Sequence, residues 1–101
     1  MKDLTDEEIA EGCVMTSDGT KRWYNKENIL HRLDGPAILC TNGSYAWYKD
    51  GKRHRLDGPA YYLKIAYKSL EIIKEWYFEG KKIECSSQEE FEKLIKLKAF
   101  W

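Results

Sequence analysis

Two identical seven-residue segments contain the side chains of this 101-residue chain that are best suited to chemistry. The segment reads His-Arg-Leu-Asp-Gly-Pro-Ala, and it occupies residues 31–37 and again residues 54–60. A histidine close to a carboxylate could act as a general base, with the arginine binding an anionic group. These two segments, called the heptads below, are therefore the first candidates for a catalytic site.

A structural role explains the heptads better than catalysis does. His-Arg-x-Asp also occurs in the catalytic loop of protein kinases, but this chain is too short for a kinase and lacks the other kinase motifs. An aspartate before Gly-Pro can cap its own turn, Gly-Pro reverses the chain, and the arginine can pair with the aspartate. An active site rarely needs two identical copies in tandem. The residues assigned to this structural motif are His31, Arg32, Asp34, Gly35, Pro36, His54, Arg55, Asp57, Gly58 and Pro59.

The cysteines do not have the spacing of a metal site. Cys13, Cys40 and Cys85 are far apart, and neither they nor His31 and His54 show the short separations typical of zinc ligands. The sequence also lacks a phosphate-binding loop, a dinucleotide fingerprint and a nucleophile elbow. We therefore expect buried free thiols, no metal, no cofactor and no enzymatic activity.

The residues best suited to contacting a partner lie next to Trp23 and Trp47. Aromatic and basic side chains alternate there, as they do in proteins that bind single-stranded nucleic acid, and Trp, Tyr and Arg also anchor protein interfaces. Seventeen basic and seventeen acidic residues cancel, which leaves no global field for nucleic acid and favours a protein partner. The candidate partner-binding residues are Arg22, Tyr24, Tyr48, Lys49, Asp50, Lys52 and Arg53.

Composition predicts a single domain over residues 1–101, located in the cytoplasm. The length is sufficient for a core without disulfides, and no apolar run approaches the roughly 20 residues of a membrane span. The acidic N-terminus lacks the apolar segment of a signal peptide, and an odd number of dispersed cysteines suits a reducing compartment. Charge is unevenly distributed, with a net of −4 over residues 1–12 and +4 over residues 13–85.

The heptads mark a repeated unit with a period of 23 residues, which is typical of repeat architectures. A Trp-Tyr pair and a turn precede the heptad in each unit, and a degenerate third unit begins at Trp76 without a heptad. Asn28 stands where Gly51 stands in the next unit, so a left-handed conformation is predicted for it. Two-residue hairpin turns are predicted at Asp18-Gly19, Asn42-Gly43 and Asp50-Gly51.

The remaining patterns predict an α+β fold that is mainly β. Thr5 and Glu8 form a capping box for a helix over residues 5–12, and Ser87 begins an amphipathic helix over residues 87–99. Residues 13–84 read as β-hairpins, in which Tyr61, Leu63, Ile65 and Tyr67 share one half-buried strand face. The predicted architecture is an antiparallel β-hairpin repeat sheet with a short N-terminal helix and a C-terminal amphipathic helix. The apolar stripe of the second helix consists of Phe91, Leu94, Ile95, Leu97 and Trp101.

The pattern Trp-Tyr-x-x-Gly-x-x-His-Arg-x-Asp-Gly-Pro-Ala resembles a tandem repeat of small phage and giant-virus proteins, and it is distantly similar to MORN-type repeats. The similarity covers residues 18–84 and implies a stack of β-hairpins, a viral origin and a host-cell cytoplasm. Together with the lack of catalytic motifs, it predicts a non-enzymatic module that binds and blocks a host protein. An inhibitor of host defence, such as an anti-CRISPR, is one such module. A nucleic-acid-binding protein and a self-associating structural protein remain as alternatives.

Overall fold

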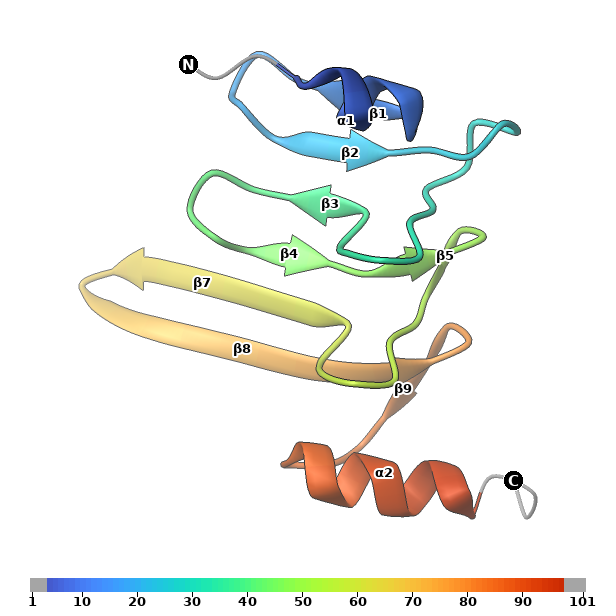
Figure 1. The fold of residues 1–101 in the computed structure, drawn as a ribbon. Coiled ribbons are helices and arrows are strands. Elements are labelled where there is room, and N and C mark those ends of the chain that lie inside the picture. The colour runs from blue at the N-terminus through green and yellow to red at the C-terminus, as the bar shows by residue number, and fades with distance from the viewer. Residues whose placement is uncertain (1–3, 98–101) are drawn as a thin grey trace.

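A computed structural model describes residues 4–97 and shows a seven-stranded antiparallel sheet with one helix near each end (Figure 1). The predicted fold class, mainly antiparallel β with a short N-terminal and a C-terminal helix, is confirmed. The elements are α1 (Asp6–Ala10), β1 (Cys13–Met15), β2 (Lys21–Trp23), β3 (Ile38–Leu39), β4 (Tyr45–Ala46), β5 (Tyr48–Lys49), β6 (Lys52–Arg53), β7 (Tyr61–Tyr67), β8 (Ser69–Phe78), β9 (Lys81–Ile83) and α2 (Gln88–Lys96).

The sheet follows the order of the chain. Its strands run β1-β2-β3-β4-β7-β8-β9, and β5 and β6 form a separate two-stranded hairpin. Each strand of the sheet therefore pairs with the next sheet strand along the chain, with the β5–β6 hairpin inserted between β4 and β7, which is how a stack of hairpins forms from a tandem repeat. The molecule is a flat slab with extents of 44 × 40 × 16 Å.

Two of the three turns predicted to contain two residues are longer loops. At Asp18-Gly19 and Asn42-Gly43, the glycine donates its N–H to the carbonyl three residues earlier, at 2.9 and 3.1 Å. The preceding Asp or Asn side chain accepts a hydrogen bond from the backbone N–H two residues later, so only the glycine takes a positive φ. Asp50-Gly51 is a two-residue turn, with φ of 50° and 81°.

Both helices lie on one side of the sheet, called the covered face below. The Glu8 carboxylate of α1 accepts a hydrogen bond from Lys21 Nζ of β2 at 2.7 Å. In α2, Phe91 is 0% exposed and packs against Trp76 of β8 and Ile83 of β9. The strand register places Lys21 and Trp76 on the same face, so the two helices cover the two ends of that face.

The helices are shorter than predicted. The capping box of Thr5 and Glu8 is present, but α1 stops at Ala10 and Gly12, with φ of 86°, leads into β1. Ser87 caps α2, whose last residue is Lys96, and the predicted residues 98 and 99, like Trp101, lie outside the described residues. Of the predicted apolar stripe, Leu94 and Ile95 pack beside Phe91, whereas Leu97 is 53% exposed. Neither helix has the length and apolar character that would let it cross a membrane.

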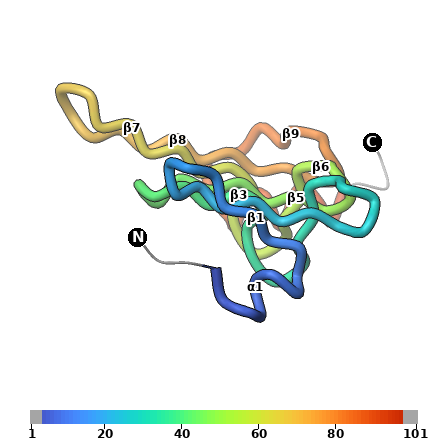
Figure 2. The backbone as a smooth tube through the Cα atoms, turned by 90° about the horizontal axis from the view of Figure 1, so that it is seen from above, coloured from blue at the N-terminus to red at the C-terminus, as the bar shows by residue number. Residues whose placement is uncertain are grey.

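The hairpin of β7 and β8 is longer than its neighbours and projects from the slab (Figure 2). β4 pairs only with the first two residues of β7, and β9 pairs only with the last three of β8. Residues 63–75, called the arm below, therefore pair only within this hairpin, and no third strand lies beside them within the described part of the chain. Half-burial was predicted for one face of this segment, but Tyr67 is 77% exposed, because no element packs on the arm near its tip.

Candidate protein-binding surface

Each heptad fastens one repeat to the next through its histidine. Nδ1 of His31 accepts a hydrogen bond from the backbone N–H of Asp50 at 2.9 Å, and Nδ1 of His54 accepts one from Glu79 at 3.0 Å. Asp50 and Glu79 occupy equivalent turns and have positive φ values of 50° and 49°. Each histidine therefore supports a strained turn residue in the following repeat.

The heptad arginine lies against a tryptophan. The guanidinium carbon of Arg32 is 3.9 Å from the centre of the Trp23 ring, and that of Arg55 is 4.2 Å from Trp47. Nη1 of each arginine donates to the carbonyl of the heptad proline at 3.2 Å. A Cβ on the heptad glycine would lie 2.7 Å from the guanidinium carbon in both copies. An alanine at either position would therefore displace the guanidinium from its place against the tryptophan.

The heptad aspartates pair with the arginines, as the sequence predicts. Oδ1 of Asp57 accepts a hydrogen bond from Arg55 Nε at 2.9 Å, and this bond lowers the pKa of the Asp57 carboxyl. The first copy is looser, because Arg32 Nε lies 3.5 Å from Asp34 and is buried without a hydrogen-bond partner in the described residues. The two heptads thus form the same arginine–aspartate contact, which is closer in the second copy.

Replacing Gly58 by alanine should destabilise the fold by about 1–3 kcal/mol, because the new Cβ would overlap the Arg55 guanidinium. The free energy of unfolding, measured with urea for the wild type and for Gly58→Ala, checks this expectation. A double-mutant cycle with Arg55→Ala isolates the cause, since alanine at position 58 should cost little once the guanidinium is gone. An equal cost in both backgrounds would show that the Arg55 guanidinium is not the cause of the destabilisation.

The helix α2 takes the place of the missing third heptad. Trp76 Nε1 donates a hydrogen bond to Gln88 Oε1 at 2.8 Å, and Gln88 Nε2 donates to the carbonyl of Leu56 at 2.9 Å. One amide side chain thus covers the third repeat tryptophan and connects it to the second heptad. This is the behaviour of a terminal repeat, which closes the stack instead of receiving another unit.

The described residues offer no cluster of metal ligands, since no group of three or more His, Cys, Asp or Glu side chains is placed to hold an ion. Cys13 is buried, Cys40 and Cys85 are half-buried, and burial raises the pKa of Cys13 and Cys85. A cavity of about 390 Å³ lies between the heptads, and the arginines and aspartates that line it are paired with one another. The charged heptad side chains around this cavity thus serve to hold the two heptads in place.

The opposite side of the sheet, called the open face below, has neither helix nor heptad over it within residues 4–97. The strand register places five side chains in one row across this face, because each is the direct partner of the next. The row is Arg22, Ile38, Ala46, Tyr61 and Glu75. An apolar centre is therefore flanked by a positive and a negative side chain.

Arg53 is held among three tyrosines on the open face. Its guanidinium carbon lies 4.5 Å from the ring centre of Tyr61, 5.2 Å from Tyr77 and 5.8 Å from Tyr48. The guanidinium donates hydrogen bonds to the hydroxyls of Tyr48 and Tyr77, both at 3.1 Å. This group is fixed before any partner arrives, which lowers the entropic cost of binding.

A shallow hollow of about 140 Å³ lies beside this group. Its lining is mainly apolar and includes Ile38, Ala46, Tyr61 and Leu63. At the far end of the same row, Arg22 has no ion pair or hydrogen bond to any side chain in residues 4–97. The open face thus combines an apolar hollow with an unneutralised cation.

The structure divides the predicted partner-binding residues into two groups. Strand alternation places Arg22, Tyr24, Tyr48 and Arg53 on the open face. Asp50 lies in the exposed β5–β6 turn, with its carboxylate 3.3 Å from His31 Nδ1, and Lys49 and Lys52 flank the turn at the ends of the two strands. Sequence reasoning missed the contributions of Ile38, Tyr61, Leu63 and Ile73 to the open face. The alternation of the β7 segment predicts that Tyr61 and Leu63 share a face, but it does not predict which side of the sheet that face lies on.

Comparison with protein-family models, with curated protein sequences and with solved structures finds no match to this chain. The resemblance to viral tandem repeats therefore remains a prediction from the heptad pattern.

Proposed function

We propose that the chain is a non-enzymatic module that binds a partner protein through its open face. The observation that supports this most directly is the uncovered row from Arg22 to Glu75, next to the preformed group of Arg53 and its tyrosines. Tyrosine and arginine are enriched among the residues that dominate protein interfaces. Ala46 in this row is already buried, but Val14 and Ile73 on the same face are 53% and 37% exposed, and such apolar surface gains free energy when a partner covers it.

The chemistry of the face defines what the partner must present. The hollow accepts an aliphatic or aromatic side chain, because its lining is apolar and its volume of about 140 Å³ suits one such group. Arg22 requires a carboxylate, since no residue in the described part of the chain neutralises it. We expect the partner to carry these two groups on neighbouring positions of its surface.

The resemblance to phage repeats supports a host protein as this partner, which the slab would block by covering its surface. No chemical step is needed for such a mechanism. A rigid sheet suits it, because little conformational entropy is lost on docking.

The test uses the immobilised protein, a host lysate with and without nuclease treatment, and mass spectrometry of what is retained. Two charge variants of the open face, Arg22→Glu and Leu63→Glu, are compared with the wild type. Leu33→Glu is the matched control, because Leu33 is 70% exposed on the covered side of the sheet. We expect one protein to be captured by the wild type and by the control, and to be reduced about tenfold or more by the open-face variants.

Two results would overturn the proposal. Capture that is unchanged by both open-face variants would exclude the open face as the docking surface. Capture that disappears on nuclease treatment, with a steep dependence on salt, would identify nucleic acid as the ligand.

A further inference from the structure

The arm separates charge between its two faces. The cross-strand pairs Tyr62–Lys74 and Lys64–Ile72 put both lysines on the covered side of the sheet, with Ala66 and Leu70 beyond them. Glu71 and Glu75, the acidic residues of the arm, lie on the other side. The covered side of the arm, called the basic strip below, thus combines apolar side chains with two diagonally adjacent lysines. It consists of Lys64, Ala66, Leu70, Ile72 and Lys74.

This basic strip has no counterpart in its own molecule. Neither Lys64 nor Lys74 forms an ion pair within residues 4–97, and α1 and α2 cover only the ends of the sheet. Leu70 and Ile72 of the strip are 62% and 43% exposed. The strip therefore lacks both anions and a covering apolar group.

The helix α1 carries the complementary groups. Asp6 and Glu7 in its first turn are exposed and have no ion pair to any described residue, and Ile9 on the same helix is 58% exposed. The negative charge that the sequence concentrates in residues 1–12 is therefore displayed beside an aliphatic side chain. These are the features that the basic strip would bind.

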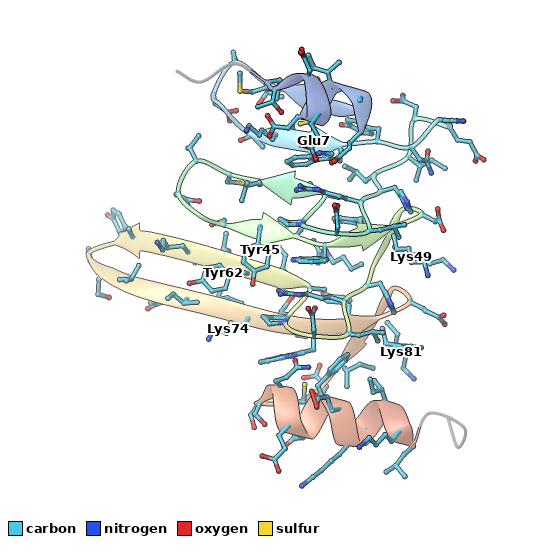
Figure 3. All side chains as sticks on the ribbon, viewed as in Figure 1. Glu7, Tyr45, Lys49, Tyr62, Lys74 and Lys81 are labelled. Carbon is cyan, nitrogen blue, oxygen red and sulfur yellow. The ribbon has the colours of Figure 1, made fainter. Side chains whose placement is uncertain are left out.

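A single row of side chains connects the two surfaces. Lys21, which binds Glu8 of α1, pairs in turn with Leu39, Tyr45, Tyr62 and Lys74 across the covered face. The row spans four inter-strand steps, about 19 Å. Tyr45 and Tyr62 lie at its centre, half-exposed and stacked at 5.0 Å with an interplanar angle of 2°. Figure 3 shows Glu7, Tyr45, Tyr62 and Lys74 one below another in this view.

We propose that two copies of this chain form a dimer in which α1 of each copy packs on the basic strip of the other. A twofold axis parallel to the strands and passing near Tyr45 turns one covered face toward the other and reverses the row. The acidic helix of one copy then lies opposite Lys64 and Lys74 of its partner, and the tyrosines meet at the centre.

The symmetry explains why both contacts are needed. The strip is about 17 Å long and 10 Å wide, which is small beside the roughly 800 Å² per subunit that a stable interface buries. Two reciprocal contacts and the central tyrosines together bury more surface than one contact alone, so a stable dimer needs all of them. The dimer also leaves both open faces outward, so self-association is independent of the surface proposed above for the partner protein.

Sedimentation velocity of the full-length protein tests the proposal. We expect a dimer at about 100 μM protein, with a dissociation constant that rises when the ionic strength is increased. The double variants Lys64→Glu/Lys74→Glu and Asp6→Lys/Glu7→Lys should each raise this constant about tenfold or more. Mixing these two variants should restore the dimer, because each reversed surface then faces its opposite.

The control is the double variant Lys26→Glu/Lys49→Glu, which changes charge equally at exposed residues outside the row. It should leave the dimer unchanged. A monomeric wild type, a dimer insensitive to the arm variant, or failure of the mixture to restore the dimer while both variants remain folded by circular dichroism would each overturn the proposal.

Discussion

Substituting Gly12 by alanine is expected to lower the free energy of unfolding by about 2–5 kcal/mol, a large part of the stability of a small domain. Gly12 has φ of 86°, and an added Cβ would lie 2.2 Å from the backbone oxygen of Tyr24. The Tyr24 N–H also donates to the carbonyl of Gly12 at 3.1 Å, so the two chain segments are held at this short distance. A backbone group cannot move aside as a flexible side chain can.

Gly43→Ala is the matched control, because the conformation is the same and the surroundings are not. Gly43 has φ of 92°, but the closest atom to an added Cβ is Lys64 Nζ at 3.7 Å. This variant should cost only the left-handed strain, about 1–2 kcal/mol. Urea unfolding followed by tryptophan fluorescence gives both values, and equal losses would show that the junction of α1 with the sheet relaxes freely.

The repeat made much of the fold predictable from sequence. Identical heptads imply identical local structure, and the two copies do place their His, Arg and Gly residues in equivalent contacts. The left-handed Asn28 is confirmed by its φ of 63°, because its position was inferred from Gly51 in the other copy. Turn lengths were predicted less well, since the side chains of Asp18 and Asn42 close longer loops than an Asx-Gly pair alone indicates.

Features that depend on register across several strands could not be predicted. Alternation showed that Tyr61, Leu63, Ile65 and Tyr67 share a face, but it does not say which face the helices cover. The row from Arg22 to Glu75 joins residues from five strands, and each pairing depends on loop lengths that the sequence left open. The sequence therefore identifies the candidate residues one by one, and only the strand register shows that several of them share one surface.

The division of the slab into two faces follows from how each repeat buries its tryptophan. Trp23 and Trp47 point to one side, and the heptads fold over that side because their arginines stack on the rings. The tryptophans and the heptads that stabilise the fold thus lie on one face. The other face retains the side chains that alternate with the tryptophans, and these are the tyrosines and the arginine available for a partner.

A large loss from a single core truncation is expected for Phe91→Ala, at about 3–5 kcal/mol. Phe91 is 0% exposed and is the central contact of α2 with Trp76 and Ile83, each of which is 7% exposed. Its removal leaves a cavity at the end of the stack, where Gln88 of the same helix also holds the Trp76 indole. Leu97→Ala, at a residue that is 53% exposed, should change stability by less than about 0.5 kcal/mol.

The way in which Phe91→Ala unfolds distinguishes two views of the helix. If α2 closes the repeat stack, the sheet loses its terminal cover and the whole chain unfolds in one transition at lower urea concentration. Tryptophan fluorescence and far-ultraviolet circular dichroism should then shift together. A fluorescence change that precedes the loss of sheet signal would show instead that α2 detaches alone, and that the strands up to β8 are stable without the helix that replaces the third heptad.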